Sequence, residues 1–322
     1  MAGVDWRPGA SRQVLETRAL LLQRIRAFFQ ERDVMEVETP ILSAARNSDP
    51  NIESIATGDR RPRFLRTSPE YPMKRLLAAG SGDIFELGRV FRGGEQGRRH
   101  NPEFTMAEWY RQGMGYMELA REVVDLIRFC GEACSDIHFQ AWPTCEISYR
   151  VLFREYAGVD PFHTDETELA AVAAERGLAS SRLSPSEWLD LLMARLIQPT
   201  LPGETFTIVH DYLPEQAALS QIRDDDPPVA ERFEVYAGQQ ELANGYQELT
   251  NASEQRARFE RDRRQRAARG EAEAPLDENL LAGLEHGLPE CAGVALGVDR
   301  LLMLMLNVDD IATVLSFPYD RA

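Results

Sequence analysis

The stretch FRGGEQGRRHNPEFTMAEWY, residues 91–110, decides the fold that the sequence predicts. It reads as the end of an alternating strand, a glycine-rich basic turn, and a second strand that returns beside the first. Period-two alternation places Phe104, Glu108 and Tyr110 on one face of the second strand. An aromatic ring and a carboxylate then point the same way, which suits a flat heterocycle held next to a small cation.

The basic residues of this turn suit a nucleoside triphosphate. A carboxylate that attacks the α-phosphorus of ATP is already ionised near neutral pH, so the site needs positive charge rather than a general base. Arg92 is the candidate, because a planar guanidinium grips carboxylate and phosphate oxygens together. We expect Arg99 and His100 to meet the outer phosphates. An ordinary hairpin with a charged turn is the alternative for each residue taken singly.

Four ordered stretches resemble the signatures of the class II aminoacyl-tRNA synthetases, and within them the lysyl branch. They are FFQERDVMEVETPIL (residues 28–42), RRHNPEFTMAEWY (98–110), ELANGYQELT (241–250) and GVALGVDR (293–300). The resemblance implies an α+β fold, the class II catalytic core, in which an antiparallel β-sheet is flanked by helices. It also implies a homodimer, with Pro40 at the interface.

The resemblance further implies the site residues. Catalysis falls to Arg92 and Arg300. The residues expected to bind ATP are Arg92, Gly93, Gly94, Arg99, His100, Asn101, Phe104, Glu241, Leu242, Gly297 and Arg300. Those expected to bind the amino-acid substrate are Ser68, Pro69, Glu70, Glu108, Tyr110, Asn244, Glu248 and Ala295.

Two carboxylates are candidates for a metal site. Glu234 and Glu241 would supply hard oxygen ligands for Mg²⁺ ions that bridge the ATP phosphates. For Glu234 the alternative is a plain surface strand in AERFEVY. Strict alternation puts Glu241 on the opposite face from Asn244 and Glu248, so one shared site requires a β-bulge between Glu241 and Asn244.

Three carboxylates predict the charge of the substrate. Glu70, Glu108 and Glu248, with Tyr110, would form an acidic pocket for a substrate that carries two ammonium groups. Neutral amino acids would leave these buried carboxylates unpaired and be rejected. Taken alone, Glu70 is equally typical of a helix start. Arg300 opens the apolar run LLMLMLNV, which predicts that it lies at the start of a helix.

Length and charge limit the organisation of the chain. The 322 residues, 43% hydrophobic, suit one catalytic domain over residues 1–322, with a short leader (1–12) and helical insertions around 112–200. An anticodon-binding module needs on the order of 100 further residues, so none is expected. A net charge of −16 also disfavours extended tRNA binding.

A lysyl-type core without an anticodon module resembles the elongation factor P β-lysyltransferases. WRPGAS (residues 6–11), YDRA (319–322) and Ala295, where lysyl-tRNA synthetases usually have Gly, carry this resemblance. It implies ATP-dependent, AMP-forming activation of (R)-β-lysine and its transfer to a lysine of elongation factor P. The alternatives are a truncated lysyl-tRNA synthetase that acts on α-lysine and tRNA, and a non-catalytic regulatory paralogue.

One position departs from the family pattern. The second signature usually has Glu two residues after its Arg, at the adenine edge, and this chain has Gly94 there, with Gly93 where Asn is common. A side-chain contact to the base is therefore lost, which predicts weaker ATP binding. The backbone of both glycines is expected to approach the nucleotide, and Glu95 is one step away.

Helical patterns are predicted at residues 14–30, 116–134, 166–176 and 186–198, and a strand at 205–209. Arg256 to Arg269 reads as a solvated helix carrying its own ion pairs, with an interface for a protein partner as the alternative. A zinc site at Cys130, Cys134, His138 and Cys145 lacks a standard ligand pattern, so reduced structural thiols are favoured. The absence of a secretory leader or long apolar span predicts a cytoplasmic protein without a membrane partner.

Overall fold

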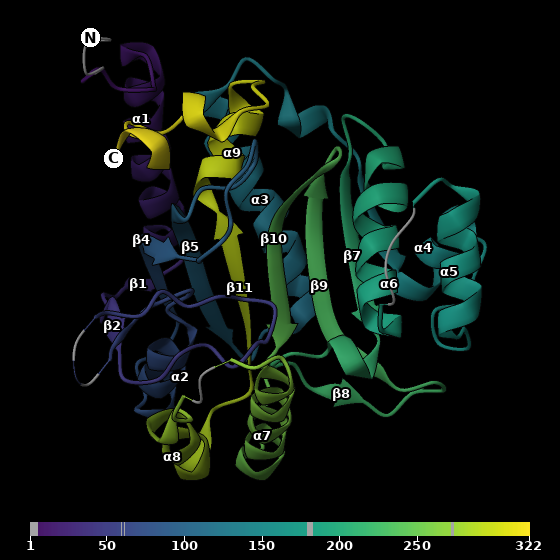
Figure 1. Cartoon of the computed structure of the whole chain (residues 1–322). Coiled ribbons are helices and arrows are strands. Elements are labelled where there is room, and N and C mark those ends of the chain that lie inside the picture. The colour runs from purple at the N-terminus through teal and green to yellow at the C-terminus, as the bar shows by residue number, and fades with distance from the viewer. Residues whose placement is uncertain (1–5, 59, 61, 179–182, 272–273) are drawn as a thin grey trace, which may run out of the picture.

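A twisted sheet carries the parts of the fold that position the site (Figure 1). The structure, a computed structural model, describes residues 6–322 except 59, 61, 179–182 and 272–273. In spatial order the strands are β1 (Met35–Glu36), β4 (Ile84–Phe91), β5 (Glu103–Gln112), β11 (Cys291–Gly297), β10 (Gln240–Gln247), β9 (Val229–Ala237), β7 (Phe206–Tyr212) and β6 (Thr144–Ser148), with β8 (Ile222–Arg223) beside β9. A separate pair joins β2 (Leu42–Ser43) to β3 (Phe64–Leu65).

Most neighbours in this sheet are antiparallel. Only the β1–β4 and β6–β7 pairs are parallel among the described strands. The hairpin predicted from residues 91–110 is present as β4 and β5, with Phe91 opposite Glu103 and Ile84 opposite Tyr110. The predicted α+β class, an antiparallel sheet flanked by helices, is confirmed.

Helices α1 (Arg12–Gln30), α3 (Tyr116–Cys134) and α9 (Val298–Met305) share one hydrophobic core with the sheet. Leu119, Val123, Ile127 and Cys130 of α3 recur every three or four residues and are fully buried, so one stripe of the helix lies against the strands. The opposite face of the sheet is left for the site. No helix in the described residues is long and apolar enough to span a lipid bilayer.

The helices between β6 and β7 build a second hydrophobic cluster beside the sheet. These are α4 (Tyr149–Tyr156), α5 (Glu166–Glu175) and α6 (Pro185–Leu192). The predicted helix at 186–198 is interrupted, since α6 ends at Leu192 and residues 193–197 form a π-helical turn. The strand predicted at 205–209 extends to Tyr212 because β9 pairs with it along that length.

Helices α2 (Glu70–Ala78), α7 (Ala252–Ala268) and α8 (Glu278–Gly287) pack together at the lower edge of the sheet in Figure 1. The arginine-rich stretch does form a helix, but the prediction of a solvated helix that carries its own ion pairs is confirmed only in part. Arg258 pairs with Glu254 in the same helix at 2.9 Å. Arg256 instead reaches Glu278 of α8 at 2.7 Å. Arg258 and Arg266 are buried rather than solvated.

The cysteines are free thiols in different surroundings. Cys130 and Cys134 lie one helical turn apart in α3 and are buried, as is Cys291. Cys145 in β6 is exposed, so the prediction of a structural thiol is wrong for this residue. Within the described residues, no cluster of three or more His, Cys, Asp or Glu side chains is arranged to hold a metal ion.

Candidate active site

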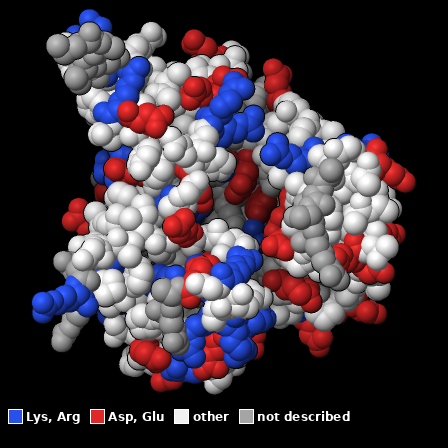
Figure 2. All heavy atoms as spheres, in the orientation of Figure 1, with Lys and Arg blue, Asp and Glu red and all other residues white. Residues whose placement is uncertain are grey.

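A cavity of about 1270 Å³ opens on the sheet face opposite α3. It is lined by strands β5, β9, β10 and β11, by residues 47–52, and by side chains from α2, α6 and α7. Figure 2 shows this hollow with acidic side chains visible inside it. All of the site residues predicted from sequence line the cavity except Pro69, Gly93 and Gly94.

The strand faces explain how distant segments meet here. Phe104, Glu108 and Tyr110 of β5 face the cavity, whereas the intervening Ala107 and Trp109 lie in the core. On β10, the pairing register with β9 shifts between Glu241 and Ala243. This irregularity is the predicted bulge, and it lets residues 241, 244 and 248 line one cavity.

Cationic side chains gather at one end of the cavity. The Arg92 guanidinium carbon lies 5.2 Å from the centre of the Phe104 ring. Arg300, in the first turn of α9 as predicted, donates to His100 Nε2 at 2.7 Å and lies 3.4 Å from Glu241 Oε2. Burial and the charge of Arg300 lower the pKa of His100, so its imidazole is neutral and accepts this hydrogen bond.

Two of the expected nucleotide-binding residues use their side chains elsewhere. Asn101 donates to the Glu103 carbonyl at 2.6 Å and accepts from the Tyr319 backbone N–H at 3.0 Å. Its amide therefore fastens the β4–β5 turn to the end of the chain. Leu242 is buried in the hydrophobic core of the sheet, although the residue also lines the cavity.

Glu234 and Glu241 lie on adjacent strands beside this cationic end. Glu234 is buried, which rules out the plain surface strand considered for it. Its oxygens accept from Arg232 Nη2 at 2.6 Å and from the Tyr236 hydroxyl at 2.5 Å. Burial and the negative charge of Glu234 raise the pKa of Glu241. Two carboxylates that repel one another in this way suit a divalent cation, which would relieve the repulsion.

Buried carboxylates gather at the other end of the cavity. Glu108 accepts from the Ser68 hydroxyl at 2.7 Å and from the Tyr110 hydroxyl at 2.8 Å. Burial, followed by the charge of Glu70, raises the pKa of Glu108 to about 8. The side chain of Glu248 is also buried, and burial raises the pKa of Glu248 to about 7.

Sequence reasoning missed a cation in the middle of this acidic group. Lys74 of α2 is 2% exposed, and its Nζ lies 2.6 Å from both Glu70 Oε1 and Glu248 Oε2. Burial alone would lower the pKa of Lys74, but the two carboxylates more than offset this and raise it. The pocket therefore carries one ammonium of its own. The available signal was the i, i+4 spacing of Glu70 and Lys74 on a helix.

Two glycine positions explain the shape of the site. A methyl group at Gly293 would lie 2.3 Å from both Glu248 Oε1 and Tyr110 Cε1, so only glycine leaves room for the acidic pocket. Gly93 and Gly94 do not line the cavity, contrary to expectation. A methyl group at Gly93 would instead lie 2.8 Å from Glu53 Cδ, and the Gly93 N–H donates to the Glu53 carbonyl at 2.9 Å. Pro69 precedes α2 as its N-cap.

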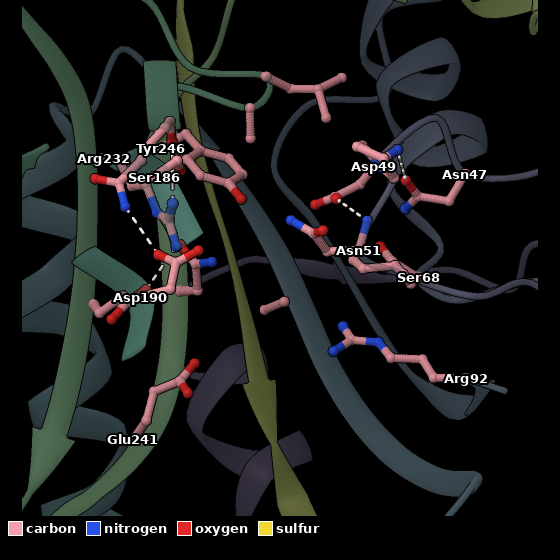
Figure 3. A pocket seen from close by; sticks show the side chains of 18 of the residues that line it. Asn47, Asp49, Asn51, Ser68, Arg92, Ser186, Asp190, Arg232, Glu241 and Tyr246 are labelled. Carbon is pink, nitrogen blue, oxygen red and sulfur yellow. Dashed lines mark hydrogen bonds and ion pairs between the residues drawn. The ribbon is translucent and has the colours of Figure 1, made fainter. Parts of the chain in front are cut away.

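Further cavity residues had no signal in the sequence. Figure 3 shows Asn47, Asp49 and Asn51 on the same side as Arg92, facing Asp190 of α6 and Arg232 of β9 across the cavity. Arg266 of α7 holds this loop by donating to the carbonyls of Ser48 and Ile52 at 3.1 and 2.8 Å. Such contacts join segments more than 200 residues apart.

Replacing Lys74 with Met should destabilise the fold. The change leaves Glu70 and Glu248 without their shared cation, and removal of one member of a buried ion pair costs about 3–5 kcal/mol. Equilibrium unfolding in urea measures the effect. Arg75→Met, on the exposed side of the same helix, is the control and should change stability by less than about 0.5 kcal/mol. Equal unfolding midpoints for the two variants would contradict this assignment.

Comparison with known proteins identifies the family of this chain. The family model for class II tRNA synthetases (D, K and N) matches residues 2–321. A protein of Proteus mirabilis named elongation factor P–(R)-β-lysine ligase is 46% identical over 99% of this chain and 98% of its own length. The proteins of that name from Vibrio cholerae and Klebsiella pneumoniae are 46% and 44% identical, over 100% and 98% of both chains. The chain therefore belongs to the class II tRNA synthetase family (D, K and N), and within it to the elongation factor P–(R)-β-lysine ligases.

Proposed function

We propose that this chain activates (R)-β-lysine with ATP and transfers the β-lysyl group to a lysine side chain of elongation factor P. One observation carries the proposal: guanidinium groups and ammonium-binding carboxylates line opposite ends of a single cavity. A substrate with a carboxylate at one end and amines at the other spans such a cavity. The names of relatives that match nearly the whole chain support the choice of substrate and acceptor.

In the first step a β-lysine carboxylate oxygen bonds to the α-phosphorus of ATP, and the bond to the β-phosphate breaks. The products are β-lysyl adenylate and pyrophosphate. Arg92 neutralises charge that develops around the α-phosphorus, and Phe104 provides an aromatic surface for the adenine. Arg300, with Arg99 and His100, meets the outer phosphates.

Mg²⁺ fits the carboxylate pair of this site. Glu241 and Glu234 would hold it, because their mutual repulsion favours a divalent cation between them. The ion would neutralise charge on the ATP phosphates. Glu234 is already held in place by Arg232 and Tyr236, which fixes the orientation of its carboxylate.

In the second step the neutral amine of the acceptor lysine attacks the carbonyl carbon of the adenylate. The new amide bond forms as the bond to AMP breaks, and the amine loses its proton. The cavity wall supplied by residues 47–52 and α7 limits the approach of water to the adenylate.

Glu108, Glu248 and Tyr110 bind the substrate amines. Because Lys74 already neutralises one carboxylate equivalent, the pocket is less acidic than its three glutamates suggest. A substrate ammonium restores charge balance only when Glu108 is ionised. Ser68 and Tyr110 then hold that carboxylate in position.

Ala295 adds a shape restriction to this charge recognition. It lies on β11 opposite Glu108 of β5 and Asn244 of β10, and it lines the cavity. Its methyl group removes room that α-lysine would use, while (R)-β-lysine carries its amino group one carbon further along. A misfit of one methylene is worth about 1–3 kcal/mol, which is sufficient to select between the two isomers.

We further propose that the enzyme is a cytoplasmic homodimer. Met35, Ile41 and Leu42 are between 43% and 50% exposed, and Ile41 and Leu42 directly follow Pro40 in the sequence, at the position that the family uses for dimerisation. Large apolar side chains exposed along one segment suit an interface. The four free cysteines suit a reducing compartment.

The reaction can be tested by its labelled product. The chain is supplied with ATP, labelled (R)-β-lysine or α-lysine, and either elongation factor P or bulk tRNA. We expect β-lysine to drive pyrophosphate exchange and to label elongation factor P alone. Labelling of tRNA by α-lysine would instead support a truncated synthetase, and no exchange with any amino acid would support a non-catalytic paralogue.

Substrate affinity should depend on pH through Glu108. At pH 6.5 this carboxyl is mostly protonated in the empty pocket, since its pKa is about 8, so an ammonium must displace its proton. Affinity should rise up to roughly 25-fold between pH 6.5 and 8.5, because the ionised fraction of a carboxyl with a pKa of about 8 rises from about 3% to about 76%, with proton release at the lower pH. Calorimetry in buffers of different ionisation enthalpy measures both quantities. Glu108→Gln should bind weakly and keep only the shallower dependence of Glu248, whose pKa is about 7; the same pH profile in wild type and variant would exclude Glu108.

Ala295→Gly tests the shape restriction. We expect the preference for (R)-β-lysine over α-lysine in pyrophosphate exchange to fall about tenfold, mainly through better use of α-lysine. Ala292→Gly, at a buried β11 position that does not line the cavity, is the control for loss of a methyl group in this strand. An unchanged ratio of the two kcat/KM values in Ala295→Gly would refute the assignment.

A further inference from the structure

Helix α7 forms part of the mouth of the cavity. Arg261, Gln265 and Ala268, spaced by four and three residues, line it together with Gln255 and Asp262 of the same helix. With 3.6 residues per turn, Arg264 lies on this same side of the helix, one turn from Arg261 and Ala268. An arginine-rich surface is therefore presented beside the opening. Figure 2 shows basic side chains gathered over α7, below the acidic hollow.

The arginines of α7 serve two different purposes. Arg258 is buried and donates to the carbonyls of Ala218 and Ser220 at 3.0 and 2.8 Å, so it anchors the helix. Arg266 anchors the loop at residues 47–52 in the same way. The other group points outward. Arg261 is 50% exposed, with its nearest carboxylate, Asp262, 4.0 Å away, and Arg264 is exposed with no ion-pair partner in the part of the chain that the structure describes.

The opposite rim of the mouth has the reverse charge. Asp190 of α6 and Glu215 line the cavity across from the middle of α7, whereas Glu187 of α6 pairs with Arg269 at the C-terminal end of α7, at 3.8 Å. A partner that inserts a lysine here meets carboxylates on one side of its cationic side chain and guanidinium groups on the other. A nucleic acid would be repelled by the acidic rim, as by the net charge of −16. A mouth with one basic rim and one acidic rim instead fits a protein that has acidic residues beside its target lysine.

We propose that Arg261 and Arg264 of α7 form a docking surface for acidic side chains that flank the modified lysine of the acceptor protein. The inference rests on the proposed function, because the acceptor must enter this mouth to reach the adenylate. A lysine side chain has a four-carbon stem, so the backbone that carries it must stay at the rim. Charge pairs at a rim act chiefly on the rate of association and are weakened by salt.

The test separates docking from adenylate formation. Variants Arg264→Glu and Arg261→Glu/Arg264→Glu are assayed for transfer of labelled β-lysine to elongation factor P at increasing acceptor concentration, and for pyrophosphate exchange. At low ionic strength we expect kcat/KM for the acceptor to fall about threefold and about tenfold, respectively. The exchange rate of Arg264→Glu should be unchanged. Raising the salt concentration should reduce the difference from wild type.

Two further variants complete the design. Arg12→Glu makes the same charge change on α1, at a side chain that is 92% exposed, and should leave transfer unchanged. Arg261→Lys/Arg264→Lys keeps the charge and should retain most of the transfer rate. The ratio of transfer to exchange is compared throughout, so that a general loss of activity is not mistaken for weaker docking.

The proposal is overturned if the double glutamate variant transfers as well as Arg12→Glu, or if its exchange falls as much as its transfer. It is also overturned if the variant loses affinity for RNA while transfer is retained. Failure of the wild-type chain to label elongation factor P at all would refute the proposed function. Equal labelling of elongation factor P by the wild type and the variants would refute only the proposed docking surface.

Discussion

The site depends on buried charged side chains that neutralise one another. Glu70, Glu108 and Glu248 would repel one another in a buried pocket. The Lys74 ammonium lies between Glu70 and Glu248 and offsets this repulsion, so that the pocket is stable in the folded protein. The remaining imbalance is what recognises a diamine, because a neutral amino acid cannot satisfy Glu108. Stability and substrate choice therefore rest on the same buried side chains.

The sheet makes this balance geometrically possible. Neighbouring strands β5, β11 and β10 present alternate residues to one face, and the bulge after Glu241 adds a carboxylate that strict alternation would hide. Gly293 leaves the space that Tyr110 and Glu248 occupy. Beneath the sheet, Arg18 of α1 pairs with Asp299 of α9 at 2.7 Å, next to Arg300, which connects the core to the phosphate end.

Features set by local periodicity could be predicted from sequence. The hairpin at residues 91–110 and the helical start before Arg300 follow from spacing along the chain, and the bulge follows from alternation once the resemblance assigns Glu241 and Glu248 to one site. Interactions between distant segments could not. Nothing local shows that Lys74 lies against Glu248, or that Arg266 of α7 anchors a loop more than 200 residues earlier in the chain. The resemblance placed Gly94 at the nucleotide, but the structure places it against Glu53.

The central claim is that the substrate amines bind the acidic end while the carboxylate meets Arg92. A crystal structure of the chain with (R)-β-lysine and a non-hydrolysable ATP analogue tests it most directly. We expect an amine within hydrogen-bond distance of Glu108, Lys74 still between Glu70 and Glu248, and the carboxylate facing Arg92. Binding of the amines at the α6 rim, beside Asp190, with an empty acidic pocket would contradict it.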